Sequence, residues 1–270
     1  MRRLRRGMLT ARAVHLAVRY DRGRNAMPHR LHALCGRVSD QCDYAPCTPR
    51  VVVREQVVKR IIFVRHGSTA SNATGVMRGW SDDVLSDIGR RQAEQSAEYL
   101  LKMLPIDVIY TSTLPRSMQT GAILSGRLGV DMHTRDDLCE VNLGTLEGRS
   151  ERELWQYFVE HAGVDRGLSA MSDVTFPGGE SVSHFLTRVL AAFADIGARH
   201  DGSVLLVSHG VLTMVALGLW FEPDVAQWYK YRVDNCSFSE VIFIPELRLV
   251  RLNETAHLVE SLKVAIDALN

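Results

Sequence analysis

The chain has only five cysteines in 270 residues, and it lacks the long apolar run that a membrane span requires. A transmembrane helix needs about 20 predominantly apolar residues. The longest candidate here, Val211–Phe221, is short and is interrupted by Thr213 and Gly218. Three of the cysteines lie in the first fifth of the chain, and their number and spacing predict no disulfide framework. We therefore expect a protein without a membrane-spanning segment, located in the reducing cytoplasm.

Lysine is absent from the first 57 residues, which contain 12 arginines and only four acidic residues. The rest of the chain has 20 basic and 27 acidic side chains, so the net charge of +1 combines a basic start with a mildly acidic body. Such a body is not expected to bind nucleic acid. With 46% hydrophobic residues, the chain can bury a full core in one large domain.

Residues 1–56 lack sustained hydrophobic periodicity, and Pro28, Pro46 and Pro49 interrupt any long element. We expect a disordered N-terminal extension here, and one functional domain over residues 57–270. An Arg-rich, acid-poor start is also typical of a mitochondrial transit peptide, and a start of translation further downstream is a third interpretation. The histidines and cysteines of this segment match no zinc-site spacing, so we expect no metal. They are His29, His32, Cys35, Cys42 and Cys47.

Two apolar runs, Ile61–Val64 and Val204–Val207, predict strands that are buried on both faces of a parallel sheet. Such strands need helices on both sides, so we expect an α/β fold. Further strands are predicted at 106–110, at 130–134 on an edge, and as an antiparallel pair at 237–244 and 247–252. Helices are predicted from the N-cap Ser86 to Pro105, from Pro115 to Gly129, and over 151–161 and 182–196.

Each of the two apolar runs leads into a His-Gly pair, in Arg65-His66-Gly67 and in Ser208-His209-Gly210. Ligands of open α/β sheets bind beyond the carboxyl ends of the strands. Arg116 falls in the first turn of a predicted helix, where a cation opposes the helix dipole unless an anion lies between it and the backbone N–H groups. A single arginine is more commonly a solvated surface side chain. Two of them, Arg65 and Arg116, at strand ends beside two His-Gly pairs favour a phosphate site.

From about Val58 to Leu258, the sequence resembles the histidine phosphatase superfamily, which has the phosphoglycerate-mutase-like fold. The resemblance implies a three-layer sandwich with a mostly parallel central sheet flanked by helices. The matching motifs follow one another along the chain. They are Arg65-His66-Gly67 with Asn72; Gly79 to Leu85 with Gly89, Gln92 and Ala93; Ser112 to Arg116 with Gln119 and Thr120; Glu140 with Gly144, Glu147 and Gly148; Pro177 to Ser181; Ser208 to Gly210; Asn235 to Ser237; and Asn253 to Leu258.

The resemblance implies that His66 attacks phosphorus and forms a phosphohistidine. It assigns the phosphoryl oxygens to Arg65, Asn72, Arg116 and His209, which would stabilise the charge of the transferring group. Glu140 would protonate the leaving alkoxide and then take a proton from water. The reaction would need no metal ion or other cofactor, because the two arginines and His209 provide the positive charge.

Two positions depart from the family pattern: Ser68 stands where Glu is usual, and Val211 stands where Gly or Asn is common. Both are candidates for the substrate pocket, as is Trp80. Three further aromatic residues, Trp155, Tyr157 and Tyr229, are candidates for the pocket wall, although aromatic residues more often belong to the core. Glu147 is interpreted as an exposed loop acid.

The resulting expectation is a metal-independent phosphomonoesterase, a hydrolase that acts on a small phosphorylated metabolite. The phosphatase branch that the sequence resembles includes alpha-ribazole phosphatases and broad-specificity sugar phosphatases. The alternative is a cofactor-dependent phosphoglycerate mutase, an isomerase. Mutases of the family carry a longer basic insertion before the Pro-Gly-Gly segment, whereas residues 149–176 contain Arg149, Arg152 and Arg166 but no lysine.

A third possibility is a non-catalytic phosphoprotein-binding module, which would be expected to lack His66 or Glu140. Both residues are present. The expected partner is the small phosphorylated substrate, with no nucleic acid and no membrane. Whether the chain forms a homodimer, and which metabolite it binds, remain open at this stage.

Overall fold

The computed structural model describes residues 59–103, 105–162, 174–222, 225–243 and 246–262. The expectations for residues 1–56, including the His/Cys cluster, and the role considered for Arg166 lie outside this part of the chain. Within it, no helix has the length and the apolar character needed to cross a membrane.

A six-stranded mixed sheet forms the centre of the domain, in the order β3-β2-β4-β1-β5-β6. The first four strands in this order pair in parallel, and β5 pairs antiparallel with both β1 and β6. The fold is therefore α/β with a mostly parallel sheet, as the sequence predicts. The strands are β1 (Arg60–Arg65), β2 (Val108–Ser112), β3 (Met132–Arg135), β4 (Ser203–Ser208), β5 (Phe238–Ile242) and β6 (Arg248–Glu254).

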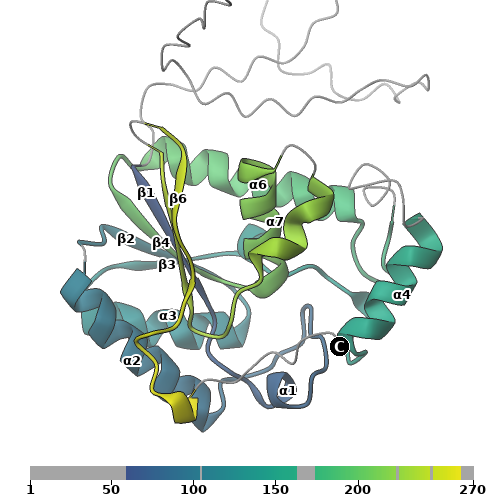
Figure 1. The fold of residues 1–270 in the computed structure, drawn as a ribbon, viewed down its shortest axis with the longest axis horizontal. Helices are drawn as coiled ribbons and strands as arrows, with labels where there is room; N and C mark the ends of the chain where they lie inside the picture. Colours follow the sequence, from purple (N-terminus) through teal and green to yellow (C-terminus); the bar gives the residue numbers. More distant parts are fainter. Residues whose placement is uncertain (1–58, 104, 163–173, 223–224, 244–245, 263–270) are drawn as a thin grey trace, which may run out of the picture. The chain divides into compact units, whose positions relative to one another are not determined.

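Helices cover both faces of this sheet (Figure 1). In β1, Ile61 and Phe63 point into a core with α6 and α7, whereas Ile62 and Val64 point into a second core with α2 and α3. This alternation explains why the strand sequence is apolar throughout, since successive side chains point to opposite faces. The helices are α1 (Ala70–Ala73), α2 (Asp87–Met103), α3 (Pro115–Leu128), α4 (Glu151–Ala162), α6 (Val182–Arg199) and α7 (Gly210–Phe221).

The helix ends follow local sequence signals. The Ser86 hydroxyl accepts a hydrogen bond of 3.1 Å from the Gly89 N–H at the start of α2. Pro115 is the first residue of α3, and Gly129 ends that helix in the left-handed conformation, with φ of 66°. These three signals had predicted the same ends.

Two local features differ from the sequence patterns. The strand expected at 106–110 is β2, and it begins two residues later because the backbone and side chain of Asp107 bond to the Ser203 backbone outside the ladder. The segment after Gly67, for which no element is predicted above, contains the short helix α1. Thr69 and Asn72 form a capping box there, so that each side chain accepts a hydrogen bond from the other residue's backbone N–H.

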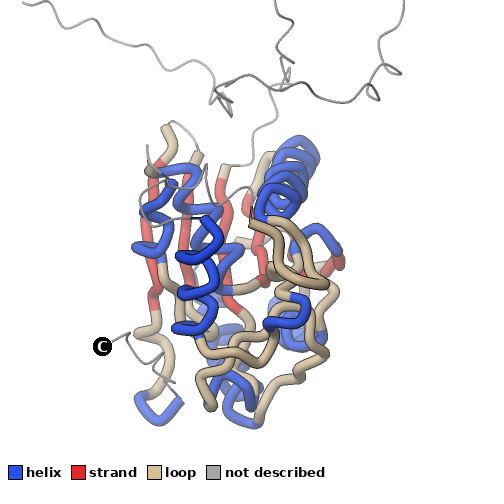
Figure 2. Tube along the Cα trace, turned by 90° about the vertical axis from the view of Figure 1, so that its right-hand side faces the viewer, coloured by secondary structure: helices blue, strands red, loops and turns tan. Residues whose placement is uncertain are grey.

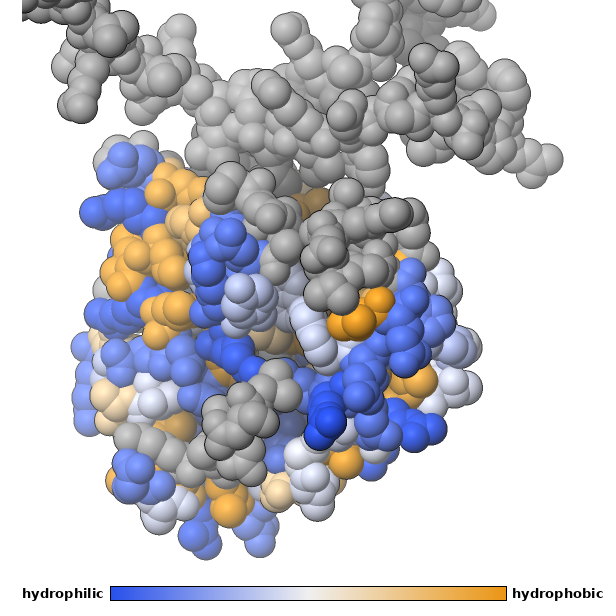
Figure 3. Space-filling view, turned by 45° about the vertical axis from the view of Figure 1, so that its right-hand side comes forward, coloured by the Kyte–Doolittle hydropathy of each residue, from blue (hydrophilic) through white to orange (hydrophobic). Residues whose placement is uncertain are grey.

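Most of the loops gather beyond one end of the strands in the side view of Figure 2. That end carries the carboxyl termini of the parallel strands, including Arg65 of β1 and Ser208 of β4. Side chains on the face shown in Figure 3 are largely hydrophilic, with smaller apolar areas between them. The apolar side chains of the central strands are buried within the two cores.

Candidate active site

The two His-Gly pairs meet because β1 and β4 are neighbours in the sheet. Arg65 lies opposite Ser208 in the parallel register, so His66 and His209 both follow the last paired residues of their strands. Their ring centroids lie 5.2 Å apart, and both side chains are buried. The fold therefore brings the histidines of the two His-Gly pairs together.

His66 is held in one ring orientation. Its Nδ1 lies 2.8 Å from the Gly67 carbonyl oxygen, which can only accept, so Nδ1 carries the proton. Its Nε2 accepts a hydrogen bond of 3.2 Å from Nε of Arg116. Burial, together with the charges of Arg116 and Arg65, lowers the pKa of His66 well below its usual value. The ring is therefore neutral at physiological pH, and its unprotonated nitrogen is Nε2, whose lone pair accepts from Arg116.

Gly67 lets the backbone after β1 approach the backbone of α2 closely. A Cβ at this position would lie 2.5 Å from the carbonyl oxygen of Gly89 in α2. The Gly67 N–H donates to the hydroxyl of Thr120 in α3 at 3.0 Å. Gly67 thus packs the loop that follows His66 against the two helices that cover this face.

The Arg116 guanidinium is buried and is fixed by backbone carbonyls. Its Nη1 donates to Ser81 at 3.0 Å and its Nη2 to Gly79 at 2.7 Å. Arg65 donates through Nη1 to the Val233 carbonyl at 2.7 Å, while its buried Nε has no partner among the described residues. An unpaired buried donor is costly. A bound anion beside Arg65 would satisfy it.

His209 does not carry the positive charge that the sequence led us to expect. Burial, followed by the positive charge of Arg116, lowers the pKa of His209 well below its usual value. Its Nε2 lies 2.7 Å from the Ser112 hydroxyl, and its buried Nδ1 has no partner within the described part of the chain. When Ser112 donates to Nε2, the ring proton lies on Nδ1, which can then donate to a phosphoryl oxygen.

The Glu140 carboxyl group lies at the N-terminus of α7. It accepts hydrogen bonds from the backbone N–H groups of Val211 at 2.9 Å and Leu212 at 3.1 Å. Burial raises the pKa of Glu140, and the N–H groups of Val211 and Val141 oppose that rise by favouring the charged form. A raised pKa keeps a carboxyl group protonated to a higher pH than an exposed glutamate, as a proton donor requires.

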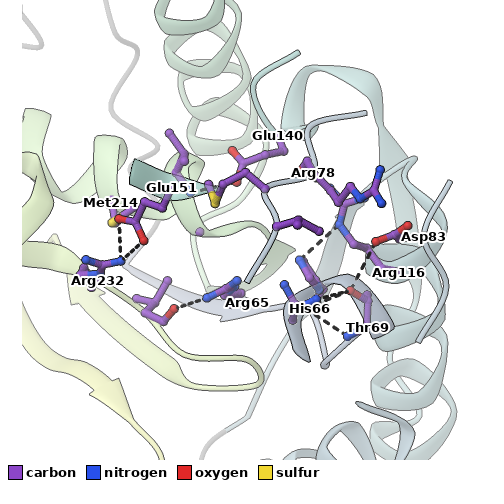
Figure 4. A pocket seen from close by; sticks show the side chains of 16 residues that line it. Arg65, His66, Thr69, Arg78, Asp83, Arg116, Glu140, Glu151, Met214 and Arg232 are labelled. Atoms are coloured by element: carbon purple, nitrogen blue, oxygen red, sulfur yellow. Dashed lines mark hydrogen bonds and ion pairs between the residues drawn. The ribbon is translucent and has the colours of Figure 1, made fainter. Parts of the chain in front are cut away.

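These groups surround a small pocket with a cavity volume of about 90 Å³. His66, Arg65, Asn72, Arg116 and Glu140 all line it, and Val211 does so as expected from the sequence. Figure 4 shows His66 and Arg65 at one side of the pocket and Glu140 across from them. His209 is fully buried beside His66 and is not part of the pocket lining.

Other pocket candidates lie elsewhere. Ser68 is buried away from the pocket because its N–H donates to the Gln92 side chain at 2.8 Å, which ties it to α2. The Trp80 ring is 44% exposed and donates through Nε1 to the Glu140 carbonyl at 2.6 Å. Trp80 therefore supports the backbone of Glu140 without lining the pocket itself. Trp155, Tyr157 and Tyr229 are not among the lining residues either.

Glu147 is not the exposed acid that the sequence suggested. Its Oε1 accepts a hydrogen bond of 2.6 Å from the Trp80 backbone N–H, and the residue is half-buried. This contact joins the loop after α1 to the loop that carries Glu140.

Several charged residues of the pocket were not anticipated: Arg78, Asp83, Glu151 and Arg232. Nη2 of Arg232 donates to both carboxylate oxygens of Glu151, at 2.7 and 2.5 Å, and this pair lies across the pocket from Arg78 and Asp83 in Figure 4. The sequence signal that could have identified two of them is their closeness to the family motifs. Arg78 directly precedes Gly79, and Arg232 lies three residues before Asn235. Whether such neighbours point into a site depends on the tertiary fold.

The parallel sheet, the helices on its two faces and the paired histidines at its strand ends define an α/β protein of the phosphoglycerate-mutase-like class. Comparison with known proteins agrees. The family described as histidine phosphatase superfamily (branch 1) matches residues 61–255. The chain belongs to the histidine phosphatase superfamily.

Individual relatives carry different names. A protein named phosphoserine phosphatase 1 from Hydrogenobacter thermophilus is 29% identical, over 74% of this chain and 95% of its own length. A probable phosphoglycerate mutase GpmB from an Enterobacter species is 37% identical, over 67% of this chain and 84% of its own. The crystal structure of a putative alpha-ribazole-5′-P phosphatase from Escherichia coli superposes with a TM-score of 0.63, at 23% identity, over 75% of this chain and all of that one.

Proposed function

We propose that the protein is a metal-independent phosphomonoesterase that hydrolyses a small phosphorylated metabolite through a phosphohistidine on His66. The observation that carries the proposal is the fixed tautomer of His66, whose Nε2 lone pair lies in a pocket that Arg65 and Arg116 line beside it. A neutral imidazole nucleophile beside fixed cations suits attack on a phosphate dianion. A cytosolic location, with no macromolecular partner, belongs to the same proposal.

In the first half of the reaction, Nε2 of His66 forms a bond to phosphorus while the bond from phosphorus to the leaving oxygen breaks. Arg65, Arg116 and Asn72, which line the pocket, would hold the phosphoryl oxygens. His209, buried beside His66, would donate to one of them through its unpartnered Nδ1. Protonated Glu140 gives its proton to the leaving alkoxide. In the second half, the Glu140 carboxylate takes a proton from water, whose oxygen attacks phosphorus, and the N–P bond electrons return to Nε2.

The test of this function is hydrolysis of an aryl phosphate, p-nitrophenyl phosphate, by the wild type and by His66→Ala. We expect the substitution to abolish hydrolysis while the circular dichroism spectrum stays unchanged, because His66 is the only imidazole among the described residues that line the pocket. Trapping with ³²P-labelled substrate should label His66. A label that maps to His209, or a wild type that hydrolyses no phosphomonoester, would contradict the proposal. The second result would favour a binding module.

A mutase is the second candidate, because relatives named probable phosphoglycerate mutase are up to 37% identical to this chain. A mutase must retain a bisphosphorylated intermediate, which requires additional cations around the pocket. Arg149 instead pairs with Glu153 on the surface at 3.1 Å, and neither Arg149 nor Arg152 lines the pocket. The Arg232 charge is compensated by Glu151. Arg78 also lines the pocket, but Asp83 lines it too. The carboxylates that accompany these two arginines favour release of the dephosphorylated product.

We therefore expect release of phosphate from 3-phosphoglycerate, if the protein accepts it, to exceed conversion to 2-phosphoglycerate. The measurement follows both products with and without 2,3-bisphosphoglycerate. Conversion at a rate equal to or above phosphate release would identify a mutase.

A further inference from the structure

Arg188 in α6 reaches the backbone of the loop that carries Glu140. Its Nη1 donates to the carbonyl oxygens of Asp137 at 3.1 Å and Cys139 at 2.7 Å, and its Nη2 donates to the Glu140 carbonyl at 2.8 Å. One guanidinium group thus holds three carbonyls within four consecutive residues. The guanidinium group suits this role because its five N–H donors lie in a rigid plane.

The charge of Arg188 is compensated by a carboxylate. Nε of Arg188 lies 3.0 Å and its Nη2 2.6 Å from the two oxygens of Glu180, and both side chains are largely buried. Glu180 also accepts the Asn142 N–H at 2.8 Å through its side chain. The pair therefore binds the loop backbone on both sides of Glu140, and it adds no net charge near the Glu140 carboxyl group.

Two aromatic rings limit the movement of this arginine. The guanidinium carbon lies 4.8 Å from the centroid of Phe185 and 5.9 Å from that of Trp80. The Trp80 ring in turn donates to the Glu140 carbonyl, which thus accepts from both Trp80 and Arg188. The backbone of Glu140 is fixed by these donors, while its carboxyl group is fixed by the N-terminus of α7.

We propose that Arg188 and Glu180 form a positioning pair that sets the general acid: they hold the backbone of residues 137–142 so that the Glu140 carboxyl group faces the leaving oxygen of a phosphate on His66. Neither residue lines the pocket or touches the substrate. The inference rests on the proposed role of Glu140 and extends it to residues outside the pocket. An acid displaced by even about 1 Å loses much of its rate advantage, on the order of 100-fold.

The experiment compares kcat/KM for p-nitrophenyl phosphate and for an alkyl phosphate, glycerol 2-phosphate, in Arg188→Met and Arg188→Lys. The ratio kcat/KM reports the steps through phosphorylation of the enzyme, in which only the alkyl leaving group needs the acid. We expect Arg188→Met to lower the alkyl value about 100-fold and the aryl value less than about threefold. Lysine keeps the charge but not the fork of donors, so Arg188→Lys should show an intermediate loss.

Arg135→Met is the matched control. Arg135 also joins the same loop to α6, through Asp137 and Asp195, but it donates to neither Cys139 nor Glu140. Its replacement should lower the melting temperature without changing the alkyl-to-aryl ratio. Should Arg188→Met fail to fold, Glu180→Gln provides a second measurement. In this variant the Arg188 charge is no longer compensated, so it should lower the pKa of Glu140. The alkaline fall of kcat/KM for the alkyl substrate should then move to lower pH, with no such shift for the aryl substrate.

Equal losses on both substrates in the Arg188 variants, or the same ratio change in Arg135→Met, would show that the pair only stabilises the fold and would overturn the proposal. An unshifted alkaline limb in Glu180→Gln would do so too. A wild type that hydrolyses neither substrate would instead contradict the proposed phosphatase function, so the two failures are distinguishable.

Discussion

At the scale of single residues, Glu140 is subject to two opposing influences. Burial raises its pKa, and the backbone N–H groups of Val211 and Val141 restrain that rise. The carboxyl group therefore remains protonated to a higher pH than an exposed glutamate, yet it still ionises. An acid that must also serve as a base in the next half-reaction needs such a balance.

Glu140→Gln should lower kcat/KM for glycerol 2-phosphate by about 100- to 10,000-fold and have a much smaller effect on p-nitrophenyl phosphate, because an aryl oxide leaves without a proton. In the wild type, the alkyl value should fall as pH rises through the Glu140 pKa, since only the protonated form donates. The variant should lack this alkaline limb. The measurement is a pH profile of kcat/KM on both substrates.

Glu147→Gln is the control for this prediction, because Glu147 lies on the same loop and holds the Trp80 backbone. It should leave the ratio between alkyl and aryl substrates unchanged. If Glu140→Gln slows both substrates alike, Glu140 holds the structure or the phosphate instead of transferring a proton.

At the scale of elements, the loop that carries Glu140 packs backbone to backbone against the Pro-Gly-Gly segment. A Cβ on Gly144 would lie 2.2 Å from the Pro177 carbonyl oxygen, and one on Gly179 would lie 2.3 Å from the Asn142 carbonyl oxygen. Gly144 also has a positive φ of 54°. These contacts explain why two loops that are distant in sequence are both rich in glycine.

Gly144→Ala should therefore destabilise the protein by roughly 2–5 kcal/mol, because left-handed strain and a backbone clash add together. Gly129→Ala is its matched control: φ is 66° there, but a Cβ would meet nothing within 4 Å. That variant should lose only about 1–2 kcal/mol. Urea denaturation measures both values. Equal losses would mean that the Glu140 loop can move away from Pro177.

The same elements show what the sequence could predict. The apolar runs of β1 and β4 and the caps at Ser86 and Gly129 depend on local patterns, and they were predicted correctly. The shifted start of β2 depends on a contact with Ser203 from a distant strand, so no local pattern indicates it.

The candidate site divides in a similar way. His66, His209 and Arg116 lie in motifs at the ends of predicted strands, and their convergence follows from the parallel sheet. Arg188 lies within α6, and Arg232 directly follows a short helical segment. Neither belongs to a motif, so the sequence does not distinguish them from exposed arginines. Their partners, such as Glu180 and Glu151, are identified only once the chain has folded.

At the scale of the whole molecule, the family match and the pocket residues cover only part of the chain. The match covers residues 61–255, and all pocket residues lie between Arg65 and Val233. The first 56 residues, with their surplus of arginine, contain none of the matching motifs. The division at Val57 stays a prediction from the sequence.

A chain that begins at Val57 should accordingly keep the melting temperature and the kcat/KM of the full chain. Differential scanning calorimetry and hydrolysis of p-nitrophenyl phosphate measure the two properties, with the full-length protein as reference. A lower melting temperature or a loss of turnover in the shorter chain would show that residues 1–56 contribute to the domain, and the three cysteines there would need a structural explanation.

The register between β1 and β4 also has a consequence for how the protein acquires its activity. His66 and His209 are far apart in sequence, and they become neighbours only when these parallel strands pair with Arg65 opposite Ser208. Pairing between such distant strands requires closure of a long loop, and it is slow compared with helix formation. A slip by one residue would turn the strand's side chains to the opposite faces. Recovery of phosphatase activity during refolding would therefore follow the formation of this central pairing rather than the return of helical structure.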